Sequence, residues 1–106
     1  MMLARTVIVP GGPELSRVVY GTWRLLEDPA TATPEHLVDR LHACVDVGMT
    51  TVDTAEVYGK YAVEELIGEA LRRSPGLRQK LQIVTKCGIY VPVPRHPDRK
   101  VAYYDA

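Results

Sequence analysis

Short β-rich runs alternate with amphipathic helical segments through the middle of this chain, and that alternation limits it to few folds. Apolar residues recur at helical spacing over 37–45 and again over 63–71. β-rich runs precede, separate and follow these stripes, at 17–20, 50–53 and 81–85. Each helix can bury its apolar stripe only against a sheet, so the order predicts parallel βαβ units with right-handed crossovers.

The ends of both helices have sequence signals. Thr33 followed by Pro34 predicts a hydroxyl N-cap and a proline at the first helical position. Gly48 is placed as the C-terminal stop of that helix. The second helix is expected from about residue 62 to 73 and contains Gly68, which costs about 1 kcal/mol relative to alanine. Close packing of this helix on the sheet is the expected reason for that glycine.

Three segments follow from these boundaries: an N-terminal hairpin over 1–17, a β-α-β-α-β unit over 18–86, and an irregular, proline-containing loop over 87–106. A (β/α)8 barrel typically needs about 250 residues. The chain has 106 residues. We therefore expect an α/β fold that forms the N-terminal part of a (β/α)8 TIM barrel, a hairpin plus about three βα units, incomplete in this chain. A small open sheet is the alternative.

Charge and cysteine content exclude several classes of function. Thirteen basic side chains balance thirteen acidic ones, so no basic surface is predicted for nucleic acid or an anionic membrane. Cys44 and Cys87 match no metal or redox spacing, and we expect Cys87 to be structural. His36 and His42 are expected on a helix surface and not as metal ligands. Unlinked thiols and the lack of an apolar signal core favour a cytoplasmic protein.

Charged and phenolic side chains follow two neighbouring strands. The turn Val52-Asp53-Thr54-Ala55-Glu56-Val57-Tyr58-Gly59 carries a carboxylate and a phenol, and Lys86 follows the next strand. Loops at the carboxyl ends of parallel strands build the active sites of such folds. Side-chain alternation puts Asp53 on the face of Thr51 and Lys86 on the face of Val84. If both faces are the barrel interior, the two charges can pair, since either one buried alone is costly.

Tyr58 would lie in the loop beside that pair. A nearby ammonium favours the ionised form of a phenol, so the tyrosine could donate its proton to a carbonyl oxygen that gains negative charge. Taken singly, the three residues have ordinary interpretations: a turn aspartate, a rim tyrosine and a solvated lysine. Together, on adjacent strands and facing one pocket, they predict an acid–base site.

Four stretches resemble the aldo-keto reductases, and in particular the bacterial branch with a tryptophan after the first strand. They are the 53–59 turn, Glu65-Leu66-Ile67-Gly68-Glu69-Ala70-Leu71, Gly21-Thr22-Trp23 and Val84-Thr85-Lys86. The resemblance spans nearly the whole chain. It implies a (β/α)8 barrel, NADPH as the hydride donor, and reduction of a small aldehyde or ketone to the alcohol.

The resemblance also implies roles for individual residues. Tyr58 would be the general acid, Lys86 would strengthen its acidity, and Asp53 would hold Lys86. Trp23 and Tyr58 would contact the substrate. The residues implied to bind the cofactor are Gly21, Thr22, Trp23 and Asp53.

The chain departs from the family pattern at the fourth catalytic residue, a histidine at the end of the fourth strand. His96 lies in the proline-rich segment and is not a match, so we expect this chain alone to be inactive. The alternatives are a non-catalytic binding or regulatory subunit, which would self-associate or pair with a complementing chain, and a truncated relic of the same fold. His96-Pro97-Asp98 is also the tripeptide of J-domain co-chaperones, but the preceding strand and prolines do not fit their helical domain.

Overall fold

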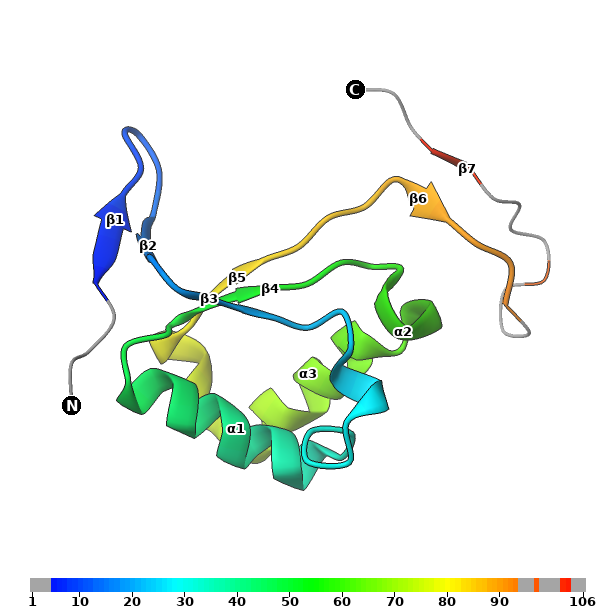
Figure 1. The fold of residues 1–106 in the computed structure, drawn as a ribbon, viewed down its shortest axis with the longest axis horizontal. Coiled ribbons are helices and arrows are strands. Elements are labelled where there is room, and N and C mark those ends of the chain that lie inside the picture. The colour runs from blue at the N-terminus through cyan, green and yellow to red at the C-terminus, as the bar shows by residue number, and fades with distance from the viewer. Residues whose placement is uncertain (1–4, 94–96, 98–101, 104–106) are drawn as a thin grey trace.

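The computed structural model describes residues 5–93, 97 and 102–103, and these form an α/β structure around one parallel sheet (Figure 1). The sheet has the strand order β3-β4-β5, and both pairs are parallel. Helix α1 connects the first pair and helix α3 the second, which confirms the predicted βαβ units. The bounds are β3 (Val19–Gly21), α1 (Pro34–Asp46), β4 (Thr51–Asp53), α3 (Val63–Arg73) and β5 (Gln82–Val84).

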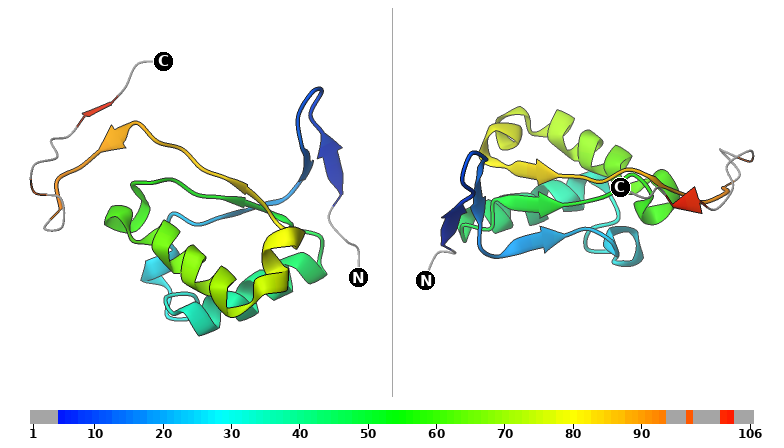
Figure 2. Two further views of the ribbon diagram at one scale, coloured as in Figure 1. Left: turned by 180° about the vertical axis from the view of Figure 1, so that it is seen from behind. Right: turned by 90° about the horizontal axis from the view of Figure 1, so that it is seen from above.

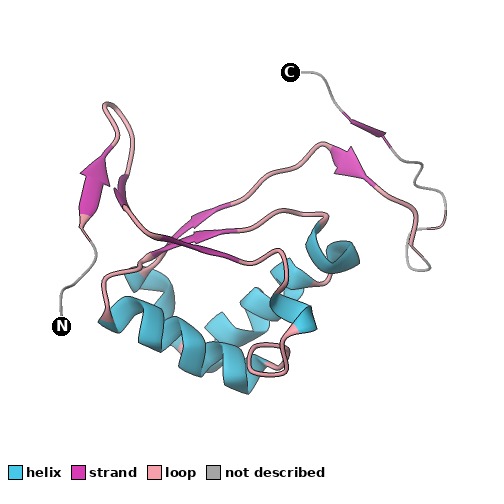
Figure 3. Cartoon of the chain, in the orientation of Figure 1, coloured by secondary structure: helices cyan, strands magenta, loops and turns pink. Residues whose placement is uncertain are grey.

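Both long helices cover the same face of the sheet (Figures 2 and 3). Tyr20, Val52 and Ile83 stand in register across the three strands and pack into the core. The helices supply the other side of this core, with Leu37, Leu41, Leu66, Ile67 and Ala70. The opposite face of the sheet carries Asp53 and is open, as Val19 and Val84 there are 43% and 40% exposed. The core therefore lies on one side of the sheet and Asp53 on the other, while Tyr58, beyond the end of β4, packs against the edge of the core.

The predicted helix ends are confirmed. The Thr33 side chain accepts a hydrogen bond from the His36 N–H at 3.3 Å, and Pro34 is the first residue of α1. Gly48 adopts a φ of 80°, and its N–H donates to the carbonyl oxygen of Val45. This left-handed residue ends the helix.

The reason expected for Gly68 is wrong. A Cβ at this position would meet only Nη1 of Arg72, at 3.9 Å, which is an ordinary contact distance. Space is therefore available on this part of α3, and close packing against the sheet does not explain the glycine.

The N-terminal hairpin is confirmed: β1 (Thr6–Ile8) pairs antiparallel with β2 (Glu14–Ser16). Two reciprocal hydrogen bonds attach it to the sheet. The Ser16 N–H donates to Thr51 Oγ1 at 2.8 Å, and the Thr51 N–H donates to Ser16 Oγ at 2.9 Å. The hairpin thus lies at the amino ends of the parallel strands, opposite the predicted site.

The shorter elements differ from expectation. Segments η1 (Leu25–Glu27) and η2 (Pro75–Lys80) are 3-10 helices. The 87–106 segment, expected to be irregular, contains the antiparallel pair of β6 (Ile89–Tyr90) and β7 (Ala102–Tyr103). Strands of two residues are too short to produce a periodic pattern. His96 and Asp98 lie outside the described residues.

Among the residues that the structure describes, no helix combines the length and the apolar character needed to cross a membrane.

Candidate active site

Asp53 and Lys86 form the centre of the site. Asp53 is the last residue of β4 and is in register with Val84 of β5, so Lys86 lies just beyond the strand on the same face. Lys86 Nζ donates to Asp53 Oδ1 at 2.7 Å and to the carbonyl oxygen of Thr54 at 2.7 Å. The pairing predicted from side-chain alternation is confirmed. The Thr54 carbonyl was not predicted, since a backbone acceptor leaves no signal in the sequence.

The ion pair is accessible and keeps the lysine charged. The side chains of Lys86 and Asp53 are 49% and 39% exposed. Partial burial lowers the pKa of Lys86, but the hydrogen bond and negative charge of Asp53, with a smaller contribution from Tyr58, outweigh it. The pKa therefore lies above the usual value of 10.5. Lys86 is consequently an ammonium group throughout the physiological pH range.

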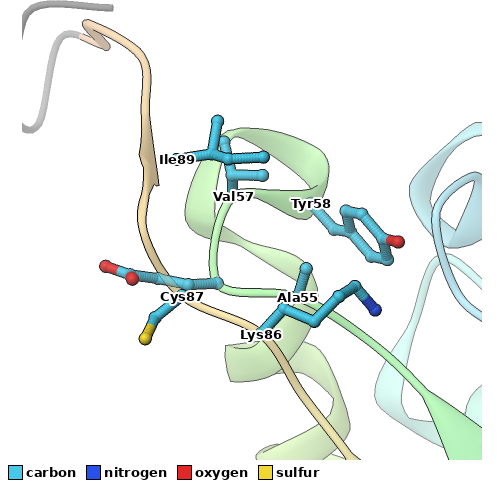
Figure 4. Close-up of a pocket in the computed structure, with 7 residues that line it drawn as sticks. Ala55, Val57, Tyr58, Lys86, Cys87 and Ile89 are labelled. Carbon is cyan, nitrogen blue, oxygen red and sulfur yellow. The ribbon is translucent and has the colours of Figure 1, made fainter. Parts of the chain in front are cut away.

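Tyr58 is positioned by a short helix and not by the loop predicted for it. It is the first residue of α2 (Tyr58–Tyr61), and its N–H donates to the carbonyl oxygen of Ala55 at 3.1 Å. Lys86 Nζ lies 5.2 Å from the centroid of its ring. Figure 4 shows the lysine amino group and the tyrosine ring side by side. The structure thus brings Asp53, Lys86 and Tyr58 together.

An unusual backbone conformation follows Tyr58. Gly59, Lys60 and Tyr61 have φ values of 60°, 54° and 72°, all in the left-handed region. A Cβ on Gly59 would lie 2.6 Å from Leu26 Cδ1 and 2.8 Å from Val63 Cγ2. Glycine is therefore required at position 59 for both conformation and space, and the resulting turn fixes where Tyr58 lies.

Trp23 extends the site from the end of β3. Trp23 is 69% exposed, and the centroid of its ring is 6.5 Å from that of Tyr58, with 30° between the ring planes. Gly21 stands in register with Asp53, and a Cβ there would meet nothing within 4 Å. Gly21 and Trp23 thus leave open surface beside the ion pair.

Thr22, unlike its exposed neighbour Trp23, lies inside the protein. Its side chain is buried, and its Oγ1 donates to the Asp53 carbonyl oxygen at 2.9 Å. Its N–H donates to the same oxygen at 3.1 Å. Thr22 therefore joins the end of β3 to β4 and supports its neighbours, and its own polar groups are occupied within the protein.

A pocket adjoins Tyr58 and Lys86 (Figure 4). Its volume of about 130 Å³ is well below the roughly 300–1,000 Å³ of pockets that enclose a small molecule. The described residues therefore form one wall of a site. The thiol of Cys87 points away from Tyr58 (Figure 4). The lining residues are Ala55, Glu56, Val57, Tyr58, Lys86, Cys87 and Ile89.

Neither histidine of α1 lies near this pocket. His36 is exposed, as expected, whereas His42 is half-buried and its Nε2 lies 3.0 Å from Ser74 Oγ. Within the described ranges, no group of three His, Cys, Asp or Glu side chains is arranged to hold a metal ion.

Comparisons of this chain with known proteins agree on one family. Residues 17–104 match the aldo/keto reductase family model. The chain is 48% identical over 92 residues to a 6-dehydroglucose reductase of Agrobacterium fabrum, covering 87% of this chain and 31% of that protein. It is 47% identical over 88 residues to the oxidoreductase YdhF of Escherichia coli, covering 83% and 29%. The chain thus spans about three tenths of the length of these curated relatives.

A solved structure shows the same fold. An aldo-keto reductase from Bombyx mori, crystallised in complex with NADP, superposes with a TM-score of 0.57 at 24% identity. The match covers 82% of this chain and 28% of that one. The family match over residues 17–104, together with this shared fold, assigns the chain: it belongs to the aldo/keto reductase family.

Proposed function

We propose that this chain forms the N-terminal portion of a (β/α)8 barrel that reduces an aldehyde or ketone to the alcohol with NADPH. The observation that carries this proposal is the Lys86–Asp53 pair beside the ring of Tyr58, at the carboxyl ends of adjacent parallel strands. Active sites of such barrels lie at this end of the strands. The relatives are oxidoreductases by name, which supports the reaction class.

Tyr58 is the proton donor in this proposal. Its hydroxyl transfers a proton to the substrate carbonyl oxygen, so that the alcohol O–H forms as the tyrosine O–H breaks. The ammonium of Lys86 stabilises the phenolate that remains on Tyr58. Asp53 and the Thr54 carbonyl hold that ammonium in place, since both accept its hydrogen bonds at 2.7 Å.

The open surface near Tyr58 is the proposed position of the cofactor. NADPH, when bound, supplies the hydride that adds to the carbonyl carbon. The uncovered backbone at Gly21 and the carboxylate of Asp53 would lie against its nicotinamide, with Thr22 as support behind them. Trp23, which is exposed and whose ring lies beside that of Tyr58, would form a wall of the substrate pocket.

Replacement of one phenolic hydroxyl tests this function. The complete barrel can be prepared as the full polypeptide, or as a chimera in which residues 17–104 replace the matching segment of the Agrobacterium fabrum relative. Oxidation of NADPH is followed with 6-dehydroglucose and simple aldehydes. We expect Tyr58→Phe to lower kcat by about 10²–10⁴-fold, the usual contribution of a positioned general acid. Cofactor affinity should be unchanged.

Tyr20→Phe is the matched control, since it removes the same group from a tyrosine that packs toward the helices. It should leave turnover unchanged. Near-parental turnover in Tyr58→Phe would contradict the proposed role of Tyr58. A protein that binds NADPH but reduces none of these carbonyls would instead support the non-catalytic binding or regulatory subunit.

A further inference from the structure

Tyr61 makes an unusual contact with the chain that leaves the site. Its hydroxyl donates to the carbonyl oxygen of Val91 at 3.0 Å and accepts from the N–H of the same residue at 2.8 Å. One phenol thus binds both polar groups of a single residue, 30 positions along the chain. Tyr61 is only 6% exposed, and its two hydrogen bonds to the half-buried Val91 are themselves partly buried.

Two contacts with residues 56–61 flank the segment 87–90, whose Ile89 and Tyr90 also pair with β7. One is the Tyr61–Val91 contact, and in the other the N–H of Glu56 donates to the carbonyl oxygen of Lys86 at 3.0 Å. The segment between the two anchors contains Ile89, which lines the pocket beside Tyr58 (Figure 4). The Tyr61 contact therefore sets how far the 87–90 segment lies from the proton donor.

The backbone of Tyr61 is strained at the position from which its side chain makes this contact. A φ of 72° is uncommon for a bulky residue, and such strain persists only where the surroundings impose it. The same left-handed run begins at Gly59, directly after Tyr58. One turn thus presents two tyrosines, the first to Lys86 and the second to Val91, directly after the 87–90 segment.

We propose that Tyr61 is a positioning residue that holds the 87–90 segment as a wall of the carbonyl-binding pocket, with Ile89 as the side chain that contacts the substrate. The inference rests on the proposed reductase function. Tyr61 thereby affects substrate binding through the segment that it holds. It takes no part in proton transfer, since its hydroxyl is hydrogen-bonded to Val91.

The test is Tyr61→Phe in the full polypeptide, read out in two ways. Amide hydrogen exchange at Val91 should become faster, because its N–H loses its acceptor. The KM for a carbonyl substrate should rise on the order of tenfold, the factor expected when a side-chain hydrogen bond that positions a wall is lost. The kcat should stay within about threefold and cofactor affinity should not change, whereas a general loss of structure would lower both.

Ile89→Ala provides the second variant. It should raise KM on its own, and the double variant should show no further rise, because both changes act on one wall. Tyr20→Phe should alter neither Val91 exchange nor KM. Unchanged exchange in Tyr61→Phe, or faster exchange with an unchanged KM, would overturn the inference. Absence of turnover in the wild type would overturn the proposed function. The exchange measurement would then still show whether Tyr61 holds Val91 in place.

Discussion

Two glycine-to-alanine substitutions, at Gly59 and Gly68, should change the free energy of unfolding in opposite directions. In Gly59→Ala the new Cβ would stand 2.6 Å from Leu26 Cδ1 and 2.8 Å from Val63 Cγ2, at a φ of +60°. The left-handed conformation costs about 1–2 kcal/mol for a residue with a Cβ. Overpacking adds about 1–3 kcal/mol. Alanine also lowers the conformational entropy of the unfolded chain, which offsets about 0.4–1 kcal/mol of this cost. We expect Gly59→Ala to lower the free energy of unfolding by about 3 kcal/mol.

Gly68→Ala is the matched substitution, with the same added methyl group. It lies inside α3, and the nearest atom to its Cβ is 3.9 Å away. Nothing opposes the helix propensity of alanine, so we expect a gain of about 1 kcal/mol in the free energy of unfolding.

Equilibrium unfolding in urea, monitored by circular dichroism, measures the change in the free energy of unfolding for both variants. For an m-value of about 1.5 kcal/mol/M, the midpoints of the two variants should differ by roughly 2–3 M. Equal m-values in wild type and variants would show that the change lies in stability and not in the denatured state. A Gly59→Ala protein with the wild-type midpoint would refute the reasoning from space and backbone conformation. A Gly68→Ala protein of lower stability would refute the statement that α3 has room there.

Two further expectations concern charge and assembly. The raised pKa of Lys86 means that its pairing with Asp53 contributes stability below pH 10.5 and that this contribution is lost as pH rises through the raised value. Asp53→Asn should therefore lower the pKa of Lys86, measured by NMR of its ε-methylene group, and an unchanged titration would contradict the pairing. The polypeptide of residues 1–106 alone should self-associate, because described apolar side chains such as Val19 and Val84 are exposed on the open sheet face. Light scattering that gives only an 11.8 kDa particle at high concentration would contradict this expectation.

The parts of the fold that could be predicted from the sequence are those with long or redundant signals. The apolar stripes of α1 and α3 each extend over more than two turns, and Thr33, Pro34 and Gly48 mark where α1 begins and ends. The Asp53–Lys86 pair was also predictable, since alternation fixes the face of each side chain and parallel strands end at the same edge.

What could not be predicted depends on contacts distant in sequence. Nothing in the local sequence predicts the left-handed conformations of Lys60 and Tyr61, which directly follow Gly59. The contact between Tyr61 and Val91 joins residues without a shared motif. The pairing of β6 with β7 involves two residues from each strand, too few for a periodic pattern. The roles of Gly21, Trp23 and Tyr58 toward ligands remain predictions.

The position of Asp53 and Lys86, away from the sheet face that carries the core, has a consequence for which substitutions this fold tolerates. Residues that hold the helices on the sheet, such as Leu37 and Val52, lie on one face, and Asp53 and Lys86 project beyond the other. Substitutions around the pocket, for instance at Ile89, therefore remove little buried apolar contact. Residues like Ile89, which line the pocket and are partly exposed, can therefore change without first requiring compensating changes in the core.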